Sequence, residues 1–159
     1  MRNKMQALLI AAVLALALTA AAAPVVQHAK GTLVPKLEPL PLSNAKDDPA
    51  RGRMSIAKQY HGDLEATALG EMLTGTGNAK GSAVYVAIER VTGTLNGRKG
   101  SFLMYHYGTM SRGSQHLEVS IVPDSGDGEL AGISGTLSLV IEKDGTHDYT
   151  LDYTLPDKP

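Results

Sequence analysis

The chain has 159 residues, with 15 Lys and Arg against 16 Asp and Glu, and a formal net charge of -1 at pH 7. It contains no cysteine, no tryptophan and one phenylalanine. The length suits one ordinary domain. The absence of cysteine excludes disulfides, thiolate chemistry and lipid attachment at a cysteine, and no basic cluster with interleaved aromatic residues supports nucleic-acid binding.

Residues 1–22 have the composition of a secretory signal peptide. Two basic residues precede an apolar run from Ala7 to Leu18, and small residues follow it. The apolar run is shorter than the roughly 20 residues that a membrane-spanning helix needs. We therefore expect cleavage after about Ala21 or Ala22, a periplasmic or secreted protein, and no stable membrane anchor.

Residues 23–53 contain five prolines and show no sustained apolar periodicity. Such a composition is typical of extended, solvated chain. We expect a flexible Pro-rich arm or linker here. An arm that packs on the following domain or on a neighbouring subunit remains the alternative.

Residues 54–157 are expected to form a β-domain. Apolar residues alternate with polar ones, most of the 17 glycines lie beyond residue 60, and no apolar stripe has helical spacing. The pattern predicts strands over residues 54–68, 82–94, 100–111, 115–123, 134–142 and 147–155, with a possible short strand near 70–74.

One predicted hairpin turns at Asn96-Gly97, a dipeptide that favours a type I′ turn because both residues need positive φ. A two-residue loop there opposes Val91 to Phe102, Glu89 to Met104 and Ala87 to His106. The reverse face then carries Val86, Ile88, Arg90, Leu103, Tyr105 and Tyr107. Both faces are largely apolar, so we expect both to be covered, one by the interior and the other by the arm, a loop or another subunit.

The last predicted hairpin turns at residues 143–145. A three-residue loop with Gly145 in the left-handed region places Leu139 opposite Tyr149 and Leu137 opposite Leu151. A two-residue loop would instead oppose Leu139 to a threonine. The three-residue loop is favoured because it keeps one apolar face intact.

Two glycine-rich blocks carry a family resemblance. The sequence reads ERVTGTLNGRKGSF over Glu89–Phe102, with His106 and Gly108 following, then VPDSGDGELAGISG over Val122–Gly135 and LDYTL near the end. Over residues 54–155 the chain resembles the domain of unknown function 3224. It departs from that pattern at Pro123–Gly128, where the family more often has Gly-Ser-Gly-Thr-Gly.

The resemblance implies a fold similar to the allene oxide cyclase and dirigent barrels, a closed antiparallel β-barrel of about eight strands. Members of those families bind small apolar molecules inside the barrel. The resemblance brings no activity with it, and we therefore carry over only the expectation of an interior cavity.

Glu89 and His106 are the candidate catalytic residues. The predicted register makes them diagonal neighbours on one face, within reach of a hydrogen bond. If that face is the interior, a carboxylate and an imidazole in an apolar barrel could act as acid and base, because burial shifts both pKa values. A purely structural pair is the alternative, and it is favoured.

Four large side chains are candidate ligand-binding residues: Tyr85, Phe102, Met104 and Tyr149. Tyrosines line pockets well because they join an apolar body to a polar tip, although core packing is the more common role. No cofactor is expected.

Two other patterns lead to no site. The block Gly126–Gly132 has neither the spacing of a phosphate loop nor that of an EF-hand, so we interpret it as a turn joining two strands. The five histidines show no paired ligand spacing, and no metal is expected.

We therefore expect an exported small β-barrel whose partner is a small hydrophobic molecule rather than nucleic acid. One alternative is an isomerase or cyclase that uses Glu89 and His106. Another is a structural homo-oligomer whose interface is the reverse face of the first hairpin. A binding role is favoured over an enzymatic one.

Overall fold

The computed structural model describes residues 25–43 and 48–156, and within them every regular element is a β-strand. The predicted signal peptide, residues 1–22, lies outside the described residues. The strands are β1 (Gln27–Leu40), β2 (Arg51–Gly62), β3 (Leu64–Thr76), β4 (Ala83–Leu95), β5 (Arg98–Ser111), β6 (Ser114–Ile121), β7 (Asp127–Gly128), β8 (Ser134–Ile141) and β9 (His147–Thr154). The predicted all-β class is confirmed.

The sheet closes into an antiparallel barrel of eight strands. The order around the ring is β1-β2-β3-β4-β5-β6-β8-β9, and β9 pairs with β1 to complete it. The two-residue β7 lies outside the ring and pairs with β5 at Gly100 and Ser101. Closure leaves none of these eight ring strands with a fully free edge.

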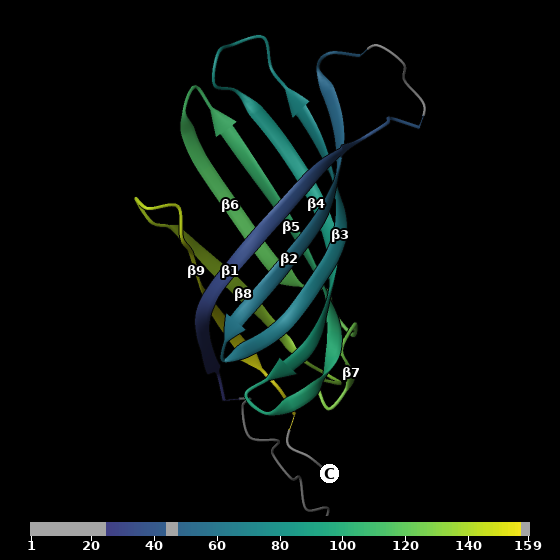
Figure 1. The fold of residues 1–159 in the computed structure, drawn as a ribbon, viewed down its shortest axis with the longest axis vertical. Coiled ribbons are helices and arrows are strands. Elements are labelled where there is room, and N and C mark those ends of the chain that lie inside the picture. Colours follow the sequence, from purple (N-terminus) through teal and green to yellow (C-terminus); the bar gives the residue numbers. More distant parts are fainter. Residues whose placement is uncertain (1–24, 44–47, 157–159) are drawn as a thin grey trace, which may run out of the picture.

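The two ends of the barrel differ (Figure 1). One end, here the closed end, carries the β2–β3 and β4–β5 turns, residues 122–133 and the last described residues. The other, the open end, carries the β3–β4, β5–β6 and β8–β9 turns. Strands β8 and β9 have 8 residues each, whereas β1–β5 have 12 to 14. The β8–β9 hairpin therefore stops short of the open end.

This short hairpin leaves a gap in the barrel wall, which we call the side window. Strand β9 pairs with β1 only as far as Leu33, so residues 34–40 of β1 have a partner on one side alone. Strands β6 and β8 share a single register pair, Ser120 with Thr136. The side window is thus bounded by β1 (residues 34–40), β6 (residues 114–119) and the β8–β9 hairpin.

Both predicted hairpin registers are confirmed. Asn96 and Gly97 have φ of 47° and 80°, and β4 pairs with β5 as the type I′ turn requires, Glu89 facing Met104. Gly145 has φ of 91°, and Leu139 faces Tyr149. Each turn residue needs a positive φ, which is why these short motifs determine register.

The expected strand over residues 54–68 is wrong, because two strands, β2 and β3, cover this part of the chain. They are joined at Gly62, where φ is 113°. The apolar alternation continues through Tyr60 and Leu64 on either side of the turn, and that continuity hid the break. The expected short strand near 70–74 is the second half of β3.

The expectation of a flexible arm over residues 23–53 is also wrong for residues 27–40, which form β1, an integral strand of the barrel. Prolines weaken a strand prediction because they cannot donate to a ladder. Pro35 and Pro39 both lie in the part of β1 that borders the side window. A strand with a partner on one side alone tolerates proline there.

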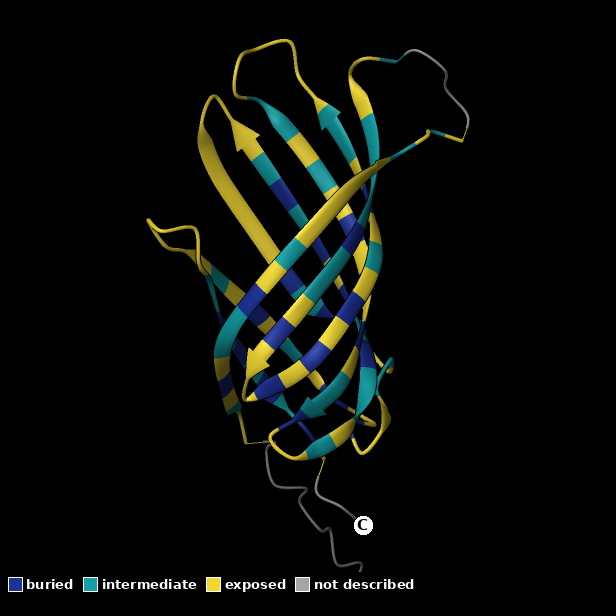
Figure 2. Cartoon of the chain, viewed as in Figure 1, coloured by how far each residue is buried: buried dark blue, intermediate teal, exposed yellow. Residues whose placement is uncertain are grey.

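The core fills the closed half of the barrel, where buried positions alternate with more exposed ones along the long strands (Figure 2). Leu130 and Ile133, from the connection between β6 and β8, are each 1% exposed and plug the closed end. Gly100 makes room for this plug, since a Cβ there would lie 3.0 Å from Cγ of Leu130. The block Gly126–Gly132 thus forms part of the connection between two strands, as predicted.

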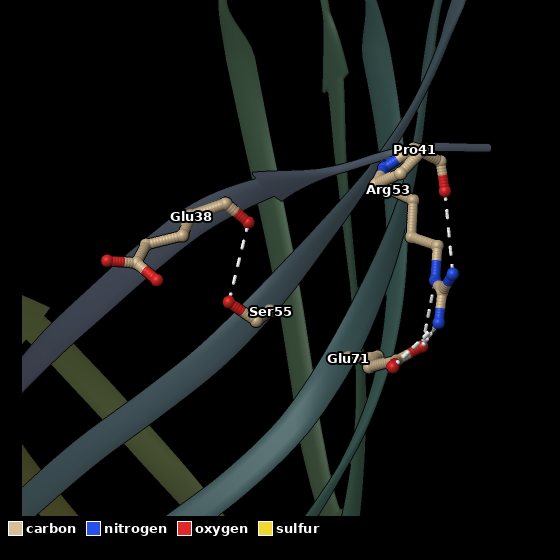
Figure 3. Close-up of polar contacts among 5 residues, drawn as sticks. All are labelled: Glu38, Pro41, Arg53, Ser55 and Glu71. Carbon is tan, nitrogen blue, oxygen red and sulfur yellow. Dashed lines mark hydrogen bonds and ion pairs between the residues drawn. The ribbon is translucent and has the colours of Figure 1, made fainter.

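On the outer surface an ion pair fastens the first strands together near the open end (Figure 3). Arg53 of β2 donates from Nε and Nη2 to the carboxylate of Glu71 on β3, at 2.6 to 2.9 Å. Its Nη1 also donates to the carbonyl of Pro41, and Ser55 donates to the carbonyl of Glu38. These contacts join β1, β2 and β3 outside the cavity.

Candidate functional site

The open half of the barrel encloses a cavity of about 480 Å³ that reaches the side window. Its walls are mostly apolar, and they come from strands on both sides of the window. The apolar lining includes Leu33, Ile56, Met72, Val119, Leu137 and Leu139. A mostly apolar cavity of this size fits a small organic molecule.

Polar side chains gather at the inner end of this cavity, which we call the floor. Lys58, Tyr60 and His106 line it, and Glu89 lies directly behind them. Nζ of Lys58 donates to Oε1 of Glu89 at 2.7 Å, and the two side chains are 15% and 0% exposed. The hydroxyl of Tyr60 lies 3.5 Å from the same oxygen. The floor is therefore built around one buried ion pair.

Strand β3 separates Lys58 on β2 from Glu89 on β4, and its interior side chains are small there. Ala68 faces Lys58 in the register, and Gly70 faces Glu89. A Cβ at Gly70 would collide with the carbonyl oxygen of Ile88 and lie 2.7 Å from Cβ of Glu89. The missing side chain lets the lysine reach across an intervening strand.

His106 on β5 lies beside the ion pair, with Nε2 3.9 Å from Oε1 of Glu89. Its ring contacts the ring of Tyr85 edge-on, at a centroid distance of 5.6 Å. Burial and, secondarily, the positive charge of Lys58 lower the pKa of His106 to about 4. The imidazole is therefore neutral at pH 7. Burial and the charge of Glu89 raise the pKa of Tyr85, so its phenol keeps its proton.

Two polar atoms at the floor lack hydrogen-bond partners among the described residues. They are Oε2 of Glu89 and Nε2 of His106, and both are buried. Leaving a buried polar atom unpaired costs about 1–3 kcal/mol. The floor therefore retains hydrogen-bonding capacity that no described protein group uses.

The predicted site residues divide into two groups. Glu89 and His106 lie on one face, as the predicted register has them, and Tyr85 lies beside His106; His106 and Tyr85 are in the cavity wall and Glu89 is behind it. Phe102 and Met104 do not line the cavity, because both are fully buried in the core of the closed half. Tyr149 does not line it either, and its hydroxyl accepts a hydrogen bond from the backbone N–H of Leu64 at 3.0 Å.

Sequence reasoning missed two residues of the floor, Lys58 and Tyr60. A signal was present, since Lys58 is the one charged residue in the alternating series Met54, Ile56, Lys58 and Tyr60. A charged residue at an interior position of a strand requires a partner of opposite charge. The partner, Glu89, lies 31 residues further along the chain, so only the fold could identify it.

Within residues 25–43 and 48–156, no group of three or more His, Asp or Glu side chains is placed to hold a metal ion. No helix in this part of the chain is long and apolar enough to cross a membrane.

Fold and site together define a closed antiparallel β-barrel with a packed closed half and an open, apolar half over a polar floor. The family model of DUF3224, described as a protein of unknown function, matches residues 29–153. The chain belongs to this family.

A solved structure agrees with this assignment. It is the crystal structure of a protein with unknown function from the DUF3224 family of Shewanella oneidensis MR-1, 40% identical to this chain. The match has a TM-score of 0.77 and covers 84% of this chain and 100% of the other. A comparison with curated proteins gives no match. The residues that the family model matches begin at residue 29, within β1. This agrees with the finding that β1 occupies part of the segment expected to be an arm.

Proposed function

We propose that the barrel binds a small, largely hydrophobic molecule in its open half. The observation that carries this proposal is the apolar cavity of about 480 Å³, reached through the side window. Burial of apolar ligand surface there would contribute roughly 25 cal/mol per Å². The packed closed half gives the cavity a rigid base.

The same geometry favours binding over acid–base chemistry by Glu89 and His106. Glu89 lies behind the cavity wall, and Lys58 already occupies its Oε1. A general base must reach the proton that it removes, within about 3 Å or through one water. The Glu89 side chain is 0% exposed and does not line the cavity, so its carboxylate does not reach a bound molecule from this position.

The proposal is tested with N-phenyl-1-naphthylamine, an uncharged probe that fluoresces in apolar surroundings. Leu139 points into the cavity, whereas its neighbour Val140 is exposed on the outer surface. We expect saturable binding by the wild-type protein, a loss of about tenfold or more in affinity for Leu139→Trp, which fills the cavity, and no change for Val140→Trp. Equal effects of the two variants would contradict binding in the cavity.

A second candidate role is that of a homo-oligomer, and one specific observation favours it. The outer face of β3, β4 and β5 carries a group of apolar side chains around Glu71, and Ile88 in this group is 59% exposed. The group comprises Leu69, Leu73, Val84, Val86, Ile88, Leu103, Tyr105 and Tyr107. Exposed apolar patches of this kind mark interaction surfaces.

The occupant that we assign to this face is a second copy of the chain. Arg90 lies between Leu69 and Leu103, Glu118 lies beside Tyr107, and both charged residues are exposed on the same outer side. In a two-fold dimer, Arg90 of one subunit can approach Glu118 of the other, and the contact occurs twice. The face is therefore complementary to itself in both charge and apolarity.

A further inference from the structure

We infer that the ligand is amphipathic and that its head group is uncharged, with a hydroxyl as the type that fits best. The inference rests on the proposed function and extends it to a ligand class. It follows from the charge, hydrogen-bonding capacity and position of the groups at the floor.

The charges at the floor favour an uncharged head group. Lys58 and Glu89 neutralise each other at 2.7 Å, and His106 beside them is neutral at pH 7. A ligand carboxylate at the floor would gain from Lys58 but be repelled by Glu89. A ligand ammonium group would be attracted by Glu89 but repelled by Lys58. Either charge would also lose its hydration in the cavity, a cost that an uncharged head largely avoids.

The unpaired polar atom in the cavity wall favours a hydroxyl. Nε2 of His106, a residue that lines the cavity, has no partner among the described residues, and it accepts or donates according to its tautomer. A hydroxyl both donates and accepts, so it can pair with this atom in either tautomer. A purely hydrocarbon ligand would leave Nε2 unpaired.

The position of the floor favours one orientation of the ligand. The floor lies at the inner end of the cavity, and apolar side chains of β1, β6 and β8 lie between it and the side window. A molecule whose head reaches His106 can place its remaining length against Val119, Leu137 and Leu139. The arrangement therefore orients the ligand, with its head inward and its tail toward the window.

The test compares three ligands with the same ten-carbon tail, namely 1-decanol, decanoate and decylamine, by isothermal titration calorimetry at pH 7. We expect 1-decanol to bind at least about tenfold more tightly than either charged compound. Equal affinities, or tighter binding of a charged compound, would overturn the inference and leave the proposed function standing. Failure of all three ligands and of the fluorescent probe to bind would overturn both.

Substitutions at the ion pair sharpen the test. Glu89→Gln leaves the charge of Lys58 uncompensated, so the preference should shift toward decanoate. Lys58→Gln leaves Glu89 uncompensated and should shift it toward decylamine. Glu71→Gln, on the outer surface, is the control and should leave the order unchanged. A pair with a merely structural role would lower all three affinities together, and that result would contradict recognition of the head group.

If either ion-pair variant fails to fold, as circular dichroism would reveal, the comparison of the three ligands on the wild-type protein still decides the inference.

Discussion

Nζ of Lys58 and Oε1 of Glu89 lie 2.7 Å apart across an intervening strand, in the interior of the barrel. A buried ion pair contributes little net stability, because desolvation of the two charges offsets their attraction. Removing one partner is costly, however, because the other charge then remains buried alone. Replacing either Lys58 or Glu89 alone should therefore destabilise the protein.

Glu89→Gln should lower the free energy of unfolding by about 3 kcal/mol, since it leaves Lys58 without its partner. The measurement is urea unfolding at pH 7. Glu71→Gln is the matched control and should cost less than about 1 kcal/mol, because its ion pair with Arg53 is exposed. The double variant Lys58→Met/Glu89→Gln should recover part of the loss. Equal costs for Glu89→Gln and Glu71→Gln would contradict the buried pair.

The stability of the protein should fall as the pH is lowered from about 6.5 to about 4. In the folded state the pKa of His106 is lowered to about 4 by burial and by Lys58, with Tyr85 and Glu89 as its other neighbours. The unfolded chain, with an ordinary histidine pKa near 6.5, binds a proton in this window while the folded protein does not. The unfolded state is then favoured by an amount on the order of 2 kcal/mol.

The measurement for this pH effect is urea unfolding at pH 7 and at pH 4.5. His106→Gln should reduce the loss of stability between the two values, because it removes the titrating group. His61→Gln, at an exposed position, should leave the loss unchanged. If the loss is as large in His106→Gln as in the wild-type protein, another group is responsible.

The parts of the fold that could be predicted are those that local chemistry determines. Asn96-Gly97 and Gly145 occupy positive-φ positions that few residues tolerate, and each register followed from its turn. The register of β4 and β5 alone was enough to place Glu89 beside His106. Strand β1 was missed because proline argues against strands, and only the neighbouring β8–β9 hairpin, by its shortness, makes Pro35 and Pro39 acceptable there.

The position of the cavity could not be predicted for a related reason. The pattern of strands β4 and β5 shows which side chains share a face, but neither which face points inward nor how far along the barrel the interior is filled. Phe102 and Met104 point inward, yet the plug formed by Leu130 and Ile133 encloses the half of the barrel in which they lie. Which half is open depends on contacts between segments far apart in the sequence.

We expect the ligand to enter the cavity through the side window. The chain contains no cysteine, so a single introduced thiol can be labelled without background. Leu117 on β6 lines the cavity at the window, whereas the side chain of its neighbour Glu118 lies on the outer surface. Bound 1-decanol should slow maleimide labelling of Leu117→Cys about tenfold and leave Glu118→Cys unaffected. Equal rates with and without ligand at both positions would exclude occupancy at the window.

The apolar outer face predicts self-association. Size-exclusion chromatography with light scattering should give the wild-type protein at least twice the mass of one chain. Ile88→Lys should produce the single-chain mass, because it places a charge at the centre of the face. Val140→Lys, which changes an exposed apolar residue on β8, should leave the mass unchanged. A wild-type protein with the mass of one chain would exclude the homo-oligomer.

Gly70 should be intolerant of even the smallest side chain. A Cβ there would collide with the carbonyl of Ile88 and approach Cβ of Glu89 to 2.7 Å, so β3 and β4 would have to separate at the ion pair. We expect Gly70→Ala to lower the free energy of unfolding by at least about 2 kcal/mol, which is typical of overpacking. Gly75→Ala, on the same strand, is the control, since its Cβ would lie 3.4 Å from the nearest atom, in Val84.

The same two variants separate a general packing defect from damage to the floor. Separation of β3 from β4 moves Glu89 away from Lys58, so folded Gly70→Ala should also lose its preference for 1-decanol over decanoate, while Gly75→Ala keeps it. The measurements are urea unfolding and calorimetric titration of the two ligands. If Gly70→Ala is as stable as Gly75→Ala, or binds the two ligands as the wild-type protein does, then the absence of a side chain at Gly70 is not what positions the ion pair.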